Sequence, residues 1–136
     1  MLRFAAPIAL ALSLTACATT PVERTITVTG SITYRERIAL PPDAQIEVKL
    51  DDVSLADAPS RTMASRSFAS EGKQVPFAFT LTLDRADIDP RHSYAVSARI
   101  TGADGKLMFI TDARNSVAFG SDSTVDMGTL VMVKTN

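Results

Sequence analysis

The segment VPFAFTLTL at residues 75–83 carries the clearest structural signal in the sequence. Apolar side chains occupy every second position, and threonines stand between the last of them. Because successive side chains of a β-strand point to opposite faces, this period of two predicts a strand with one buried and one exposed face. The buried face would hold much of the aromatic core of the protein, and its members are Val75, Phe77, Phe79, Leu81 and Leu83.

Alternating segments of the same kind flank this strand on both sides. We expect them at residues 25–34, 46–50, 94–100 and 107–111, with one or two closing strands between 117 and 132. The segment 61–70 alternates only loosely and carries charge, which is typical of an edge strand. Gly30 interrupts one alternation and indicates a bulge or close packing. The step through Asp51 and Asp52 indicates another bulge or a strand end, and Asp104-Gly105 favours a tight hairpin.

The strand count and composition together predict the fold class. Aromatic residues are only 6% of the 136 residues, Trp is absent, and Val, Ile, Thr and Ser recur densely, which suits strands better than long helices. No stretch keeps a helical period for long. We therefore predict an all-β fold, a single antiparallel β-sandwich of about seven to eight strands over residues 25–136, with a small open barrel as the alternative.

The N-terminal residues have the organisation of a lipoprotein signal peptide. A short positive region with Arg3 precedes an apolar run over residues 4–14, which is too short to span a bilayer. The run ends in Leu14, Thr15 and Ala16 before the lone Cys17. Lipoprotein cleavage requires the cysteine because its thiol carries the diacylglycerol, and it requires small residues before the cysteine because they let the extended backbone enter the protease. We therefore expect a signal peptide at residues 1–16 and lipidation of Cys17.

Residues 17–24 would form a lipidated tether. At about 3.3 Å per residue, this segment holds the domain within roughly 25 Å of the lipid. The membrane is thus one expected partner, through the N-terminal lipid. The chain has 14 Lys and Arg against 15 Asp and Glu, and this balance gives no electrostatic footprint for nucleic acid.

Three ordered segments resemble one known family. These are VTGSITYRERIALPPDAQIEVKLDDVS at residues 28–54, GKQVPFAF at 72–79 and IDPRHSY at 88–94, and the run 98–112 follows the same pattern. In this order they resemble the YbaY/YscW-type lipoprotein family, which includes a type III secretion pilotin. The resemblance implies a periplasmic β-sandwich anchored to the outer membrane. Ala18 after the anchor favours the inner face of the outer membrane by the family's sorting logic.

Catalytic and metal chemistry find little support in the sequence. His92 stands beside Ser93, but no nucleophile elbow surrounds either residue, so we expect a histidine that stabilises a turn or is exposed. Asp84, Asp87 and Asp89 lack the spacing and glycine of a calcium loop and are better interpreted as turn caps. The methionines that a soft copper site would need are spread without a histidine cluster, as expected for core residues; they are Met63, Met108, Met127 and Met132. We predict no enzyme, no cofactor and no metal.

The segment around the paired prolines is the candidate partner-binding rim. Arg35 and Arg37 form either a recognition rim or a solvated charged loop, and we favour the loop. Pro41 and Pro42 preorganise the following turn at low entropic cost, which either fixes strand register or presents a binding surface. We favour the register role.

Three functional hypotheses follow. The first is a noncatalytic lipid-anchored module that binds an envelope component and keeps it at the membrane, because tethering raises the effective concentration of weak partners. The second, implied by the resemblance, is a pilotin that escorts a secretin to the outer membrane through a groove for an amphipathic segment. The third is a small-ligand or metal-binding protein with a pocket between the sheets, lined by residues such as Phe77, Phe79 or Met127.

Overall fold

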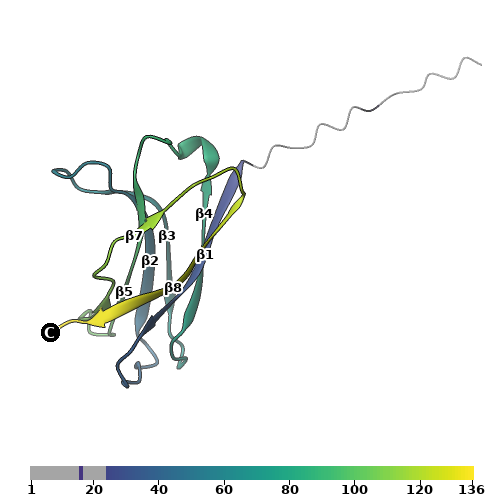
Figure 1. Cartoon of the computed structure of the whole chain (residues 1–136). Coiled ribbons are helices and arrows are strands. Elements are labelled where there is room, and N and C mark those ends of the chain that lie inside the picture. Colours follow the sequence, from purple (N-terminus) through teal and green to yellow (C-terminus); the bar gives the residue numbers. More distant parts are fainter. Residues whose placement is uncertain (1–15, 17–23) are drawn as a thin grey trace, which may run out of the picture.

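The computed structural model describes residue 16 and residues 24–136 (Figure 1). Predictions for Leu14, Thr15, Cys17 and most of the tether lie outside the described residues, and Ala16 is exposed. The elements are the strands β1 (Thr25–Tyr34), β2 (Gln45–Asp52), β3 (Arg61–Ala69) and β4 (Phe77–Asp84), the 3₁₀ turn η1 (Arg85–Asp87), and the strands β5 (Tyr94–Thr101), β6 (Leu107–Ile110), β7 (Asn115–Val117) and β8 (Thr124–Lys134). Among the described residues, no helix has the length and apolarity needed to cross a membrane.

Eight strands in the order β3-β2-β5-β6-β8-β1-β4, with β7 beside β5, confirm the predicted all-β sandwich. Strand β8 joins the two layers, because most of it pairs with β1 while Val133 and Lys134 pair with β6. Strands β3 and β4 end this path, and they lie in contact with each other without pairing, so the sandwich is nearly a closed barrel. One pairing differs from the antiparallel prediction: β1 and β8 run parallel. They come from distant parts of the chain, so no hairpin imposes an antiparallel pairing.

The core fills the space between the two layers with the side chains that alternation predicted. In β4 the pattern is strictly buried then exposed from Phe77 to Asp84. In β1, Ile26, Val28, Ile32 and Tyr34 are buried. The largest fully buried apolar side chains are Phe109, Ile26, Ile32, Ile46, Leu50, Leu81, Ile100, Met132, Val28, Val48 and Val96.

Gly30 marks a point where three strands approach closely. A Cβ atom built on Gly30 would lie 2.8 Å from Cζ of Phe79 on β4 and 2.9 Å from the carbonyl oxygen of Gly128 on β8. The β1–β8 register shifts at the same level, and Gly128 has φ +67° there. Gly30 therefore serves both predicted roles, since it lies opposite a bulge and makes room for the Phe79 ring.

The two ends of the sandwich carry different loops (Figure 1). At the end where β1 begins, Thr25 pairs with Asp84, and Arg85 N–H donates to the Arg24 carbonyl at 2.6 Å. We call this the tether end. The opposite end holds the β1–β2 loop (35–44), the β3–β4 loop (70–76), the β5–β6 turn (102–106) and the last residues of β8. We call it the distal end.

Candidate functional site: an apolar cleft at the distal end

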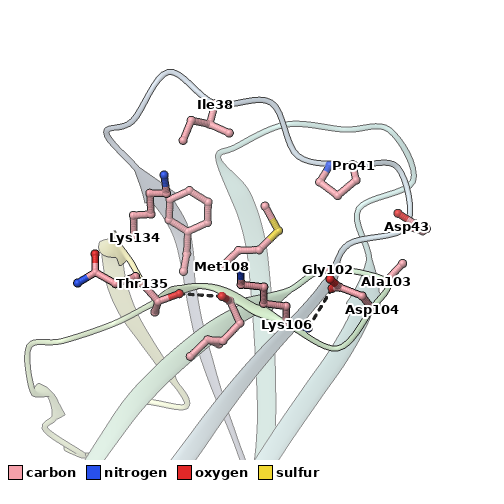
Figure 2. A pocket seen from close by; sticks show the side chains of 13 residues that line it. Ile38, Pro41, Asp43, Gly102, Ala103, Asp104, Lys106, Met108, Lys134 and Thr135 are labelled. Carbon is pink, nitrogen blue, oxygen red and sulfur yellow. Dashed lines mark hydrogen bonds between the residues drawn. The ribbon is translucent and has the colours of Figure 1, made fainter.

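The distal end contains an open cleft of about 750 Å³ between the β1–β2 loop, the β5–β6 hairpin and the end of β8. In Figure 2 the Met108 side chain projects into the space between the loop that carries Ile38 and Pro41 and the turn that carries Asp104. The lining residues are Ile38, Pro41, Asp43, Gly102, Ala103, Asp104, Lys106, Leu107, Met108, Phe109, Lys134, Thr135 and Asn136.

Tyr34, at the end of β1, fixes the start of the loop that forms one wall. Its ring stacks on Phe109 with centroids 3.9 Å apart and planes 5° apart. Its hydroxyl donates to the Ile38 carbonyl at 2.6 Å. Burial, and to a smaller extent the negative charge of Glu36, raise the pKa of Tyr34 above its usual value of 10.0. The hydroxyl is therefore protonated, and able to donate this bond, across the neutral range.

The β3–β4 loop holds the same wall from its other side. Gln74 Oε1 accepts from the Leu40 N–H at 2.8 Å, and Gln74 Nε2 donates to the Leu40 carbonyl at 3.2 Å. The side chain thus pairs with the loop backbone as a neighbouring strand would. Ser70, only 1% exposed, donates from Oγ to the Pro41 carbonyl at 2.7 Å. These bonds fix the β1–β2 loop, although the loop has no regular secondary structure of its own.

The opposite wall is a tight turn closed by its own backbone. Gly105 N–H donates to the Gly102 carbonyl at 2.9 Å, and Gly105 has φ +80°, a conformation that favours glycine. Asp104 Oδ1 accepts from the Lys106 N–H at 3.0 Å. At the floor, Thr135 Oγ1 donates to the Leu107 carbonyl at 2.7 Å, a bond drawn in Figure 2.

The cleft combines an apolar interior with a charged rim. Ile38, Pro41, Leu107, Met108 and Phe109 supply the apolar surface, and the charged side chains around them are Asp43, Asp104, Lys106 and Lys134. Rim charges of both signs give no net attraction for an anion or a cation. Such a surface can accept the apolar side chains of a peptide or a small molecule and orient them by polar contacts at the edge.

The structure brings one of the four predicted rim residues to the cleft. Pro41 lines the wall, and Pro42 follows it as an exposed residue. Arg35 and Arg37 are exposed on the same loop but do not line the cleft. Sequence reasoning missed Ile38 and Met108. The available signal for Ile38 was an apolar residue directly after the charged run 35–37, in a loop that continues into two prolines.

Of the residues predicted to line a pocket between the sheets, Phe77 lines an open hollow of about 350 Å³ between the distal ends of β3 and β4, whereas the space around Phe79 and Met127 is filled by side chains. Phe77 and Phe79 are buried, and the Phe79 ring occupies the space above Gly30. Met127 is half-buried and packs against the core. A close-packed interior leaves no room there for a ligand, so any ligand site must be sought at the surface.

His92 belongs to a cluster at the tether end that braces loops. Its Nδ1 lies 2.6 Å from Oδ2 of Asp52, and its Nε2 lies 3.7 Å from Oδ2 of Asp89. Hydrogen bonds from Arg91 lower the pKa of Asp89 to about 2, and hydrogen bonds from Ser54 and then from His92 lower the pKa of Asp52. The imidazole thus faces carboxylates rather than a serine nucleophile, as expected for the turn-stabilising role.

Two of the three aspartates proposed as turn caps, Asp84 and Asp89, act as caps. Asp84 Oδ1 accepts from the Ala86 N–H, and Asp89 Oδ1 accepts from the Arg91 N–H, each at 2.9 Å. Within residues 24–136 no group of three His, Cys, Asp or Glu side chains is placed to hold a metal ion.

Comparisons with known proteins agree with this architecture. A family model described as "Type III secretion system lipoprotein chaperone (YscW)" matches residues 23–128. The uncharacterized lipoprotein YbaY of Escherichia coli (strain K12) is 45% identical over 107 residues, which are 79% of this chain and 55% of that protein. The chain therefore spans about half the length of this curated relative.

A solved structure is similar over the whole β-domain. An alternative pilotin from the type II secretion system of Vibrio cholerae is 47% identical, with a TM-score of 0.69, and the match covers 80% of this chain and 97% of that one. The names printed for these similar proteins are those of a lipoprotein chaperone family, a lipoprotein and a pilotin. The chain belongs to the YscW family of envelope lipoproteins.

Proposed function

We propose that the chain is a noncatalytic module, anchored through lipidated Cys17 to the periplasmic face of the outer membrane, and that its distal cleft binds a segment of another envelope protein. The observation that carries the proposal is the cleft itself, about 750 Å³ with an apolar interior and a wall fixed by Tyr34, Ser70 and Gln74. A fixed wall lowers the entropic cost of ordering a partner segment.

The most specific form of this proposal is a pilotin whose partner is a secretin. It is supported by the likeness to the Vibrio cholerae pilotin over nearly the whole of that chain. The geometry suits an amphipathic helix, which would place apolar side chains spaced by three and four residues against Ile38, Met108 and Phe109. Lys and Asp at the rim would meet the polar face of such a helix.

A matched pair of substitutions tests the cleft. Ile38 and Val131 are apolar side chains of nearly equal exposure, 39% and 37%. Ile38 lines the cleft, whereas Val131 lies on β8 beside Thr33 of β1 and does not line it. We expect Ile38→Glu to abolish partner binding and Val131→Glu to leave it intact.

The assay is crosslinking in cells followed by affinity capture from solubilised envelopes. The proposal expects a secretin to be captured by wild type and Val131→Glu but not by Ile38→Glu. It expects Cys17→Ser to release a folded domain from the membrane fraction and to leave the secretin unsorted. Equal secretin capture by both glutamate variants would contradict the cleft as the binding site.

Small-molecule binding is the second candidate, because the cleft volume lies in the range of ligand pockets. Capture of no protein by wild type, together with a thermal shift on adding an apolar small molecule that Ile38→Glu abolishes, would favour it.

A further inference from the structure

The β2–β3 loop, residues 53–60, presents an unusual side chain at the tether end. Leu55 is 71% exposed, the highest value among the large apolar side chains that are exposed in the described residues. The loop reads VSLADAPS, so Asp57 is its only charged residue and most of the others are apolar or small. A single exposed leucine is common on protein surfaces. Whether Leu55 has a function therefore depends on where it lies and on how firmly its loop is held.

The base of this loop is held firmly. Val53 N–H donates to the Ser93 carbonyl at 2.8 Å, and Ser93 N–H donates to Ser54 Oγ at 2.9 Å. Ser54 donates from its N–H and its hydroxyl to Asp52 Oδ1, at 3.0 Å and 2.5 Å. The same Asp52 carboxylate meets His92. Leu55 therefore follows directly after an anchored residue.

The loop projects at the end where the chain enters the domain (Figure 1). The Arg24 carbonyl accepts a hydrogen bond from the Arg85 N–H just after β4. The segment that follows Arg85 leads to His92, whose ring contacts Asp52, the last residue of β2 before the loop. If Cys17 carries a lipid, residues 17–24 hold this end within roughly 25 Å of the bilayer even when fully extended. The distal cleft lies at the other end of β1.

We propose that the β2–β3 loop is a second membrane contact, in which Leu55 inserts into the lipid surface and orients the domain with its distal cleft facing away from the membrane. The partner of this surface is a lipid bilayer, because the lipidated tether holds this end close to the membrane and close to no other large apolar phase. Charged residues of both signs adjoin the loop: Asp57 lies within it, Arg61 stands opposite Asp52 in the β2–β3 pairing, and Arg91 is ion-paired with Asp89 at 3.0 Å. The contact is therefore apolar, and added salt should weaken it little.

This inference rests on the proposed anchoring through Cys17, and one experiment separates the two. The chain contains no Trp, so a single substitution supplies a spectroscopic probe. Full-length Leu55→Trp and, as a control at the distal end, Ile38→Trp are lipidated in cells and reconstituted into phosphatidylethanolamine and phosphatidylglycerol vesicles. Flotation with the vesicles reports the anchor, and quenching of Trp emission by brominated lipids reports insertion.

We expect both proteins to float, with emission shifted to shorter wavelength and quenched for Leu55→Trp only. Floating protein with no quenching at position 55, or equal quenching at position 38, would overturn the inference and leave the anchor standing. Failure to float would overturn the anchor and the inference with it.

A second measurement removes the effect of the probe itself. A polarity-sensitive dye is attached to the cysteine of Asp57→Cys, because the acylated Cys17 cannot react with it. The emission of the dye with and without lipid is measured with Leu55 present and again in the Leu55→Asn background. A lipid-induced shift that the asparagine abolishes supports insertion through Leu55. The same shift in both backgrounds overturns it.

Discussion

Replacing Gln74 with Ala removes the side chain that pairs with the backbone of Leu40 in the cleft wall. Two hydrogen bonds disappear, of 2.8 Å and 3.2 Å. At roughly 1 kcal/mol for each bond, the free energy of unfolding should fall by about 2 kcal/mol. For a domain of about 110 residues, the entropy of unfolding near 60 °C converts this into a fall in Tm of about 9 °C.

Two readouts check the prediction. Circular dichroism gives the Tm, and hydrogen exchange followed by NMR gives the protection of the Leu40 amide, for which Gln74 is the hydrogen-bond acceptor. Gln45→Ala is the matched control, because Gln45 is an exposed glutamine at the first residue of β2, directly after the β1–β2 loop, and its side chain makes no hydrogen bond within residues 24–136.

We expect Gln74→Ala to lose both Tm and Leu40 protection, and Gln45→Ala to keep both. The affinity of the cleft for its partner should fall in Gln74→Ala as well, because a loosened wall must be ordered on binding. A Leu40 amide that stays protected in Gln74→Ala, with an unchanged Tm, would show that this side chain does not hold the wall.

Three further predictions follow from the core and from the titrating groups. Gly30→Ala should lower the free energy of unfolding measured by chemical denaturation by about 1–3 kcal/mol. Adding Phe79→Leu to the same chain should recover only part of this loss, because the Gly128 carbonyl oxygen still lies 2.9 Å from the new methyl group. Full recovery would refute this geometry. Because the pKa of Tyr34 is higher in the folded state than its unfolded value of 10.0, the unfolded chain deprotonates first, and stability should fall as pH rises above 10. Tyr34→Phe should show a smaller fall in denaturant midpoint between about pH 9 and 11, and an equal fall would exclude this residue. The Asp89 carboxyl should titrate near pH 2 by NMR, so its stabilising contribution is present above pH 3.8 and is lost as pH falls through about 2. Arg91→Ala should move this titration back toward 3.8, and an unmoved titration would exclude Arg91 as the cause.

Local features of the fold could be predicted because short patterns encode them. Alternation in β1, β2, β4 and β5 gave the buried faces directly. The expected irregularity at Asp51 appears as a register shift after Leu50, with Met63 as the extra residue on β3. Asp104-Gly105 closes a hairpin, as that dipeptide favours. In each case the responsible interactions lie within a few residues of the signal or across one strand pair.

The cleft could not be predicted because its walls meet only after folding. Ile38, Asp104, Met108 and Lys134 are separated by up to 96 positions, and no period in the sequence connects them. Met108 packs against the core, as predicted, but a methionine in an alternating segment gives no sign that it also lines a cleft. The parallel β1–β8 pairing escaped prediction for the same reason, because it joins the two extremes of the domain.

The pairing of the first strand with the last also determines when the domain can fold. β1 lacks a neighbour on one edge until β8 has emerged, and β8 also completes β6. Contacts of such long sequence separation form late and slowly. A chain of which only the first hundred residues are available therefore lacks β8, cannot close its sandwich and stays unfolded. The C-terminal strand is therefore the element whose pairing completes the folding of the domain.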